Sequence, residues 1–213
     1  MYQPDHFRVD DLPEMHALMR ARPLVTLVSG GAAGLYATHL PTVLKDRDRY
    51  GVIEFHLARA NPHWKYLTEC DEALIIFQGP DGYITPNWYP SKAKHQQVVP
   101  TWNYAVVHAY GRPEVMQDVD WLRGHVAELT AKQEKSEASP WALTDAPERY
   151  IEVMLRGIVG FRFVITRLEG KWKMSQNREM RDREGVVKGL ENRSEGDDRE
   201  VAASVLHHMK PHS

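Results

Sequence analysis

The sequence predicts a mainly β-sheet protein with inserted helices, an α+β fold built on a small antiparallel barrel. Two observations predict it. Short apolar and β-branched runs dominate the first half of the chain, and helical patterns are inserted between them. This order differs from the regular strand–helix alternation of parallel sheets. Neither G-x-G-x-x-G nor G-x-x-x-x-G-K-[ST] occurs, so a dinucleotide-binding fold and a P-loop have no support.

Composition predicts an ordinary globular protein. Of the 213 residues, 42% are hydrophobic and 26% are charged, which allows one domain, alone or with a small appendage. The formal charge of −2 gives no sign of nonspecific nucleic-acid or membrane binding. Cys70 is the one cysteine, so an internal disulfide is excluded. The N-terminus lacks signal-peptide features and no apolar run could span a bilayer, so a cytoplasmic protein is expected.

The first half of the chain is predicted to hold two helices and six strands, the second helix starting at Asn61-Pro62. Leu12, Met15 and Met19 follow helical spacing within Asp11–Met19. The predicted strands are Leu24–Ser29, Leu35–Leu40, Val52–Ala58, Ala73–Gln78, Tyr83–Tyr89 and Thr101–Tyr110. Turn signals at Gly30-Gly31 and Pro80-Asp81-Gly82 predict reversals, the second of which makes residues 73–89 a hairpin. Gly111-Arg112-Pro113 is predicted to bend the last strand.

The second half is predicted to be more helical. Asp118–Lys132 is amphipathic, and Glu148–Leu155 starts after Pro147 and ends at Gly157. Val159–Arg167 and Lys171–Ser175 are predicted to form a hairpin around Glu169-Gly170, and helices are expected over Glu184–Leu190 and Asp198–Met209. The predicted division is a barrel domain over 1–180 and a charged helical extension over 181–213.

Three segments are polar where a strand ends, and they are candidate ligand contacts. They are Ala37–Pro41, His56–Pro62 and Pro100–Tyr104. A flat anionic ligand needs an apolar face, hydrogen-bonding partners for its edge, and cations or hydroxyls for its phosphate.

A helix start predicted at Asn61-Pro62 offers a phosphate site, because the first amides of a helix are free to donate hydrogen bonds. Arg59 and Lys65 add positive charge on either side. The alternative is that Asn61 only caps the helix and that both cations are solvated.

Trp102 and Tyr104 alternate on their strand and therefore share one side of it. They could stack on a ligand ring, line a dimer interface or fill the barrel core. His39 could bind a ligand or be structural.

Common hydrolytic and metal signatures are absent. The histidines from His6 to His125 show no H-E-x-x-H or H-x-x-x-H spacing, and no G-x-S-x-G occurs. His207, His208 and His212 cluster at the tail, which is interpreted as solvated or weakly metal-binding, so no metal site is predicted. Cys70 lies between Glu69 and Asp71, which would raise the pKa of its thiol and make it a poor nucleophile. No catalytic residue is assigned.

Six motifs occur in order along the chain. They are Met1-Tyr2-x-Pro4-x-His6-Phe7, Ala37-Thr38-His39-Leu40-Pro41, Ala58-Arg59-Ala60-Asn61-Pro62, Phe77-Gln78-Gly79-Pro80, Val99-Pro100-Thr101-Trp102-Asn103-Tyr104 and Ser175-Gln176-Asn177-Arg178. With these motifs the chain resembles the PaiB-like family of FMN-binding negative transcriptional regulators. The resemblance spans residues 1 to about 190, and six ordered motifs are far more specific than any one alone.

The resemblance implies an FMN-binding split β-barrel similar to pyridoxamine-phosphate-oxidase-type flavoproteins. In such proteins two subunits pair and each FMN lies in a groove at their interface. It also implies a set of FMN-binding residues. They are Thr38, His39, Leu40, Pro41, Ala58, Arg59, Ala60, Asn61, Lys65, Trp102, Asn103, Tyr104, Ser175, Gln176 and Asn177. Of these, Trp102–Tyr104 and Ser175–Asn177 would close the site, from the same or the partner subunit.

Three functions stay open at this point. The first is an FMN-binding regulator of the PaiB type that acts directly or through a partner. The second is a flavin-dependent oxidoreductase, and the third is a split-barrel module with another ligand or none. Direct DNA binding is doubtful, because Asp182–Met209 carries four basic and seven acidic residues.

Overall fold

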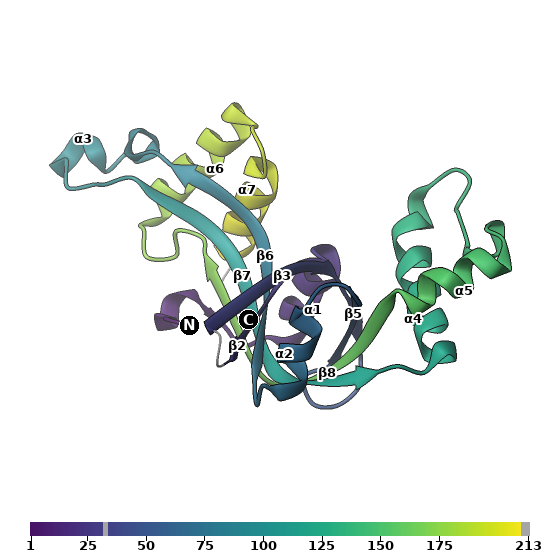
Figure 1. Cartoon of the computed structure of the whole chain (residues 1–213). Helices are drawn as coiled ribbons and strands as arrows, with labels where there is room; N and C mark the ends of the chain where they lie inside the picture. Colours follow the sequence, from purple (N-terminus) through teal and green to yellow (C-terminus); the bar gives the residue numbers. More distant parts are fainter. Residues whose placement is uncertain (32–33, 210–213) are drawn as a thin grey trace. The chain divides into compact units, whose positions relative to one another are not determined.

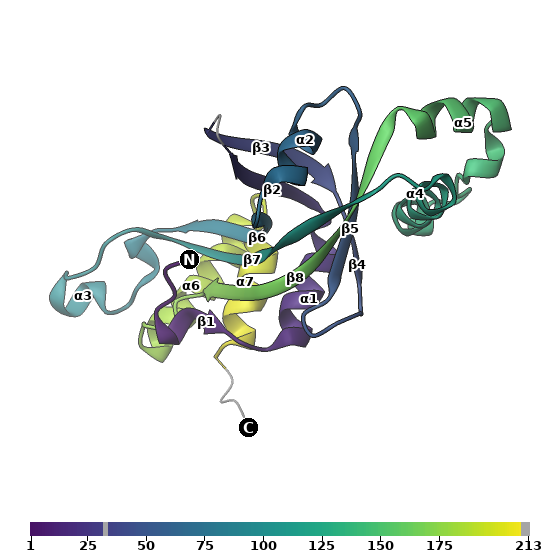
Figure 2. The same ribbon diagram turned by 60° about the horizontal axis from the view of Figure 1, so that its bottom comes forward.

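The computed structural model describes residues 1–31 and 34–209 (Figures 1 and 2). In chain order the elements are η1 (Asp5–Phe7), β1 (Arg8–Val9), α1 (Leu12–Ala21), β2 (Leu24–Gly31), β3 (Gly34–Pro41), β4 (Val43–Lys45), β5 (Val52–Ala58), α2 (His63–Glu69), β6 (Ala73–Ile84), η2 (Pro86–Trp88), α3 (Lys92–His95), β7 (Thr101–Met116), α4 (Val119–Gln133), η3 (Glu134–Ser136), η4 (Leu143–Asp145), α5 (Glu148–Arg156), β8 (Ile158–Lys173), α6 (Met180–Arg193) and α7 (Asp198–His207).

These elements form two compact units, each assembled from separate stretches of the chain. Unit 1 contains residues 1–15, 78–107 and 169–213, and unit 2 contains residues 16–77 and 108–168. Strands β6, β7 and β8 each supply residues to both units.

Unit 2 is built on antiparallel sheet. β2 pairs with β3 on one side and with β6 on the other, and β5 lies between β4 and β8. Alternate residues of β2 are buried, as expected for a strand with one face on the core. Phe55 of β5 and Phe161 of β8 are opposite in register, are fully buried and stack with ring centroids 5.2 Å apart. Burial of such large apolar side chains is the main driving force for this packing.

Unit 1 contains the paired helices α6 and α7, which lie side by side (Figure 1). Val186 and Leu190 of α6 and Val201 and Val205 of α7 are fully buried. Polar groups are satisfied inside the same unit. Asp182 of α6 is buried and accepts hydrogen bonds from the Ser91 amide at 2.9 Å and the Ser91 hydroxyl at 2.6 Å.

The middle of α6 packs tightly on η2. A β-carbon on Gly185 would lie 2.0 Å from the Trp88 carbonyl oxygen, and one on Gly189 would lie 2.2 Å from the Trp88 ring. The Arg193 guanidinium lies 5.0 Å from the centre of the same ring. The two glycines thus make room for Trp88 on the helix surface.

Most predicted elements are confirmed. β5 has the bounds predicted for it, and α1, α4, α5 and α7 differ from their predictions by a few residues at their ends. Asp118 caps α4, since its carboxylate accepts from the Trp121 amide. α6 is longer than predicted, and β4 is a strand that the sequence analysis missed. The predicted extension over 181–213 stays a prediction, and its residues 210–213 lie outside the described part.

The predicted hairpin over residues 73–89 is wrong, because β6 continues without reversal from Ala73 to Ile84. Alternate residues are buried up to Gly79, and the alternation resumes one residue out of phase at Gly82. Such a slip is typical of a β-bulge, which can accommodate Pro80-Asp81 without ending the strand. Residues 86–88 form the short helix η2 instead of a strand. The reversal predicted at Gly30-Gly31 is confirmed, because β2 and β3 pair antiparallel with Gly31 opposite Gly34. The two glycines themselves belong to β2, and residues 32 and 33 lie outside the described part.

The second predicted hairpin and the predicted bend at residue 111 are also wrong. β8 runs unbroken from Ile158 to Lys173, and β7 continues through Gly111. A β-carbon on Gly170 would lie 2.9 Å from the Val9 carbonyl oxygen, and one on Gly111 would lie 2.2 Å from the Val164 carbonyl oxygen. Both glycines therefore permit close strand contact rather than a turn.

Candidate functional site

Five side chains of unit 2 form a polar group that we call the Thr38 cluster. Its members are Ser29 of β2, Tyr36 and Thr38 of β3, Asn61 in the loop after β5, and His63, the first residue of α2. Ser29 and Tyr36 are opposite each other in the β2–β3 register, and Thr38 lies two residues farther along β3. The cluster thus joins a hairpin, a strand end and a helix start.

His63 is the centre of the Thr38 cluster. It is fully buried, and its Nε2 lies 2.9 Å from the Ser29 hydroxyl while its Nδ1 lies 2.7 Å from the Thr38 hydroxyl. The Tyr36 ring lies 4.7 Å from the imidazole. Burial lowers the pKa of His63 below its ordinary value, so the ring is neutral at neutral pH.

Asn61 completes the cluster and corrects the predicted helix start. α2 begins at His63 rather than at Asn61-Pro62. The Asn61 side-chain oxygen accepts from the His63 amide at 3.0 Å, and its amide nitrogen donates to the Thr38 hydroxyl at 3.3 Å. Asn61 therefore connects the end of β5 to β3 as well as supporting the first amide of the helix.

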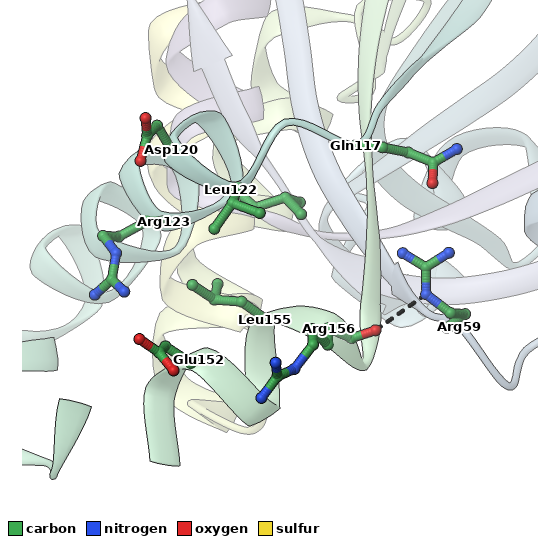
Figure 3. Close-up of a pocket in the computed structure, with 9 residues that line it drawn as sticks. Arg59, Gln117, Asp120, Leu122, Arg123, Glu152, Leu155 and Arg156 are labelled. Atoms are coloured by element: carbon green, nitrogen blue, oxygen red, sulfur yellow. Dashed lines mark hydrogen bonds between the residues drawn. The ribbon is translucent and has the colours of Figure 1, made fainter. Parts of the chain in front are cut away.

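Arg59 and Lys65 have different surroundings. The Arg59 guanidinium donates to the carbonyl oxygens of Arg156 and Ile158, both at 3.0 Å. It also lines a cavity of about 540 Å³ beside α4 and α5, whose other lining residues include Gln117, Leu122 and Leu155 (Figure 3). Lys65 is exposed on α2, with its ammonium 5.8 Å from the Trp64 ring.

The other predicted contacts of unit 2 lie near the same strand ends. His39 is exposed on β3 and bonds the Thr26 hydroxyl at 3.1 Å, whereas Leu40 is buried and Pro41 ends the strand. Ala58 ends β5, and Ala60 is exposed in the turn that follows.

The remaining predicted residues lie in unit 1. Asn103 is fully buried on β7, and its side-chain nitrogen donates to the Ser175 hydroxyl at 3.0 Å. Ser175 has a left-handed backbone with φ of 64°. Gln176 holds the same turn, accepting from the Met174 amide at 2.6 Å and donating to the Trp172 carbonyl at 2.7 Å. Asn177 follows in this turn.

The aromatic residues of β7 are only partly in the core. Trp102 is 53% exposed, so the interpretation that it fills the core is wrong, and its ring lies edge-on to that of Tyr83 at 5.9 Å. Tyr104 is half-buried, with the Lys171 ammonium 5.3 Å from its ring. Lys173 donates to the Thr101 hydroxyl and the Trp102 carbonyl, and burial lowers the pKa of its ammonium.

The structure thus gathers the predicted residues into two groups, one in each unit. Thr38 and Asn61 meet in unit 2, and Asn103 and Ser175 meet in unit 1. Sequence reasoning missed Ser29, Tyr36 and His63. The strand register was the signal that could have found Ser29 and Tyr36, because it puts both of them on one face with Thr38.

A metal site and a membrane-spanning helix are both absent from the described residues. Within residues 1–31 and 34–209, no group of three or more potential ligands is arranged to hold a metal ion. No helix of this part is long and apolar enough to cross a membrane. Burial raises the pKa of the Cys70 thiol, in the predicted direction but chiefly through desolvation.

Comparison with known proteins identifies the family. Residues 1–167 match the family described as "Putative FMN-binding domain". The chain belongs to this family. A relative, "Protease synthase and sporulation protein PAI 2" of Bacillus subtilis, is 31% identical over 210 residues that cover 99% of each chain. An uncharacterized protein of Emericella nidulans is 35% identical over 84% of this chain and 85% of its own length. The predicted resemblance to PaiB-like proteins is confirmed.

Solved structures share the fold at low sequence identity. The FAD and heme binding protein from Mycobacterium smegmatis has a TM-score of 0.59 and 15% identity, over 78% of this chain and 73% of its own. The flavocytochrome Anf3 from Azotobacter vinelandii also has a TM-score of 0.59, with 14% identity over 78% of this chain and 69% of its own. The predicted fold class, a mainly antiparallel split barrel with inserted helices, is confirmed.

Proposed function

We propose that this member of the family binds FMN, and that the Thr38 cluster with the adjoining end of β5 holds part of the flavin. One observation carries the proposal. A half-buried hydroxyl, Thr38, and a side-chain amide, Asn61, meet at the outer strand β3 within two motifs of the family.

The residues present fit a flavin in chemical terms. The polar edge of a flavin ring needs hydroxyl, amide and backbone partners. Thr38 and Asn61 supply the first two, and β3 is the end strand of the described sheet, with β2 on one side of it. The exposed ammonium of Lys65 suits a phosphate, while Arg59 is already held by two carbonyl oxygens. A bound flavin would supply reversible electron or hydride transfer.

The rest of the proposed site remains a prediction from the sequence. Trp102, Asn103 and Tyr104, together with Ser175, Gln176 and Asn177, would contribute to flavin binding in a homodimer. Exposed apolar side chains are available for such pairing, since Trp102 is 53% exposed and Leu35 is 83% exposed.

The biological role that we propose is regulation of the PaiB type, exerted in the cytoplasm through a partner rather than by direct DNA contact. Three of the four basic side chains counted in the C-terminal helices make hydrogen bonds within the chain. Arg183 donates to the His208 carbonyl, Arg193 pairs with Asp198, and Arg199 donates to the Ser194 hydroxyl. A flavin-dependent oxidoreductase would use the same site, and turnover of a reduced nicotinamide would distinguish it.

The proposal is tested by identifying the bound cofactor. The freshly purified protein is examined by absorbance, and any released flavin is identified by chromatography. Flavin-free protein is then titrated with FMN and with riboflavin, followed by quenching of flavin fluorescence. We expect saturable FMN binding, weaker binding of riboflavin, and a clear loss of FMN affinity in Thr38→Val. Absence of saturable FMN binding by the folded protein would overturn the proposal.

A further inference from the structure

We propose that His63 is a positioning residue that turns the Thr38 hydroxyl into a hydrogen-bond donor for the bound ligand. The proposal rests on the proposed function, because it concerns the same site. The observation behind it is a chain of contacts from Ser29 through His63 to Thr38, with Asn61 at the far end. Ser29 and His63 are both buried, so their end of this chain of contacts is shielded from water, whereas Thr38 is half-buried.

Asn61 fixes the direction of the hydrogen bond at its own end of this chain of contacts. Its side-chain oxygen accepts from the His63 backbone amide, so the Asn61 nitrogen must face Thr38. That nitrogen can only donate, and it therefore occupies one of the two lone pairs of the Thr38 hydroxyl oxygen.

The neutral His63 ring has two tautomers, with different consequences for Thr38. If Nε2 carries the proton, Nδ1 must accept the Thr38 hydroxyl proton, and Thr38 has none to offer a ligand. If Nδ1 carries the proton, it donates to the second Thr38 lone pair. Both lone pairs are then filled, and the Thr38 hydroxyl proton must point away from Asn61 and His63.

Ser29 decides between the two tautomers. Its side chain is 3% exposed, and among the described residues its hydroxyl has one side-chain contact, to His63 Nε2 at 2.9 Å. A buried hydroxyl proton without an acceptor is unfavourable. If Nε2 accepts that proton, the ring proton lies on Nδ1. The one hydroxyl proton left without a partner is then that of Thr38, which is half-buried and can reach water or a ligand. Ser29 thus acts on Thr38 through the imidazole, without touching it.

The tautomer can be measured without a ligand. Flavin-free protein labelled with ¹⁵N-histidine is examined by NMR at neutral and mildly alkaline pH, and His63 is assigned by the loss of its signals in His63→Asn. We expect a protonated Nδ1 and an unprotonated Nε2. A protonated Nε2 in the folded protein would overturn the inference whether or not FMN binds, so this outcome is separate from failure of the proposed function.

Ligand affinity supplies a second readout. Asparagine can place an amide nitrogen near the Nδ1 position, whereas glutamine extends toward the Nε2 position. We expect His63→Asn to keep FMN affinity within about threefold, and His63→Gln and Thr38→Val each to lose about tenfold, the scale of one hydrogen bond. Thr68→Ala is the matched control, because within residues 1–31 and 34–209 the Thr68 hydroxyl bonds only the Lys65 carbonyl of its own helix. It should bind FMN as the wild type does.

Coupling between Ser29 and Thr38 is the sharpest test. Ser29→Ala should weaken FMN binding about threefold in the wild type and have no effect in Thr38→Val. A merely structural Ser29 would give the same loss in both backgrounds, and such additivity would refute the inference. Because Ser29→Ala removes one small hydroxyl, this arm remains informative if the His63 variants do not fold.

Discussion

The imidazoles of His56 and His125 meet with 3.1 Å between Nδ1 and Nε2, joining β5 to α4 inside unit 2. His125 is 3% exposed, and the Trp121 ring stacks on it at 5.3 Å. Burial, with His56 and Lys45 nearby, lowers the pKa of His125 to about 4, although Glu128 acts in the opposite direction. Burial also lowers the pKa of His56. The pair is therefore neutral in the folded protein at neutral pH.

This pair predicts loss of stability in acid. The unfolded chain takes up protons on both rings near pH 6.5, whereas the folded protein resists protonation of His125 down to about pH 4. The contribution of His125 to the free energy of unfolding is therefore fully present above pH 6.5. It is lost as the pH falls below this value, by roughly 3 kcal/mol at pH 4. Urea unfolding across this range should show a smaller decrease in His125→Gln. The exposed His95→Gln is the control and should keep the wild-type slope.

Lys65 is predicted to contact the phosphate of FMN. Lys65→Ala should weaken FMN binding about tenfold and leave riboflavin affinity unchanged, because one charge-assisted hydrogen bond is lost. Lys132→Ala removes a lysine that pairs with Glu128 elsewhere in unit 2 and should change neither affinity. Equal loss for both flavins would show that Lys65 acts on the fold or the ring rather than on the phosphate.

Gly111 and Gly124 are predicted to respond oppositely to alanine. A β-carbon at Gly111 would collide with the Val164 carbonyl oxygen, and the strands would have to separate. We expect Gly111→Ala to lower the free energy of unfolding by about 3 kcal/mol. A β-carbon added to Gly124 in α4 would meet no described atom within 4 Å apart from its chain neighbours and its own helix backbone, so Gly124→Ala should raise the free energy of unfolding by about 0.5–1 kcal/mol. Chemical denaturation measures both.

A homodimer is expected in solution. Light scattering at micromolar concentration should give twice the chain mass of 24.5 kDa. Replacing the exposed indole in Trp102→Glu should shift the mass toward that of one chain, since a carboxylate opposes burial at an interface. Val153→Glu alters a comparably exposed side chain on α5 and should remain dimeric. A wild-type mass of one chain would contradict the expectation.

The isolated protein is predicted to bind DNA weakly. The C-terminal helices carry more acidic than basic residues, and Arg193 is already paired with Asp198. Fluorescence anisotropy with labelled duplex should show low affinity at physiological salt and little dependence on sequence. Tight, sequence-selective binding that weakens when the lysines and arginines of residues 182–209 are neutralised would be evidence against this.

The sequence predicted correctly those helices and strands that a short stretch of residues defines by itself. The apolar run of β5 and the capped, amphipathic α4 were recognised because each contains its own start and end. β6 and β8 were misread, because Pro80 and Gly170 have the chemistry of turn residues. Gly170 is needed instead for the approach of β1, a contact between distant parts of the chain. Single-sequence reasoning cannot detect such a contact from composition.

The same difference between local signals and distant contacts applies to the candidate site. Thr38 and Asn61 were predicted as ligand contacts through the family motifs, and the structure brings them together. The role of His63 depends on the β2–β3 register and on the loop after β5, so no spacing in the sequence reveals it. The grouping of Asn103 with Ser175 likewise follows from strand pairing across a long sequence separation.

The close packing of Trp88 on α6 has a consequence for how unit 1 opens. Two glycines within about one turn lower the intrinsic helicity of α6, since each costs about 1 kcal/mol relative to alanine. The indole that fills the space over Gly185 and Gly189 belongs to η2, which follows the end of β6. The backbone amides of α6 should therefore exchange with solvent deuterium at a rate governed by undocking of η2, so that α6 and η2 behave as one cooperative foldon.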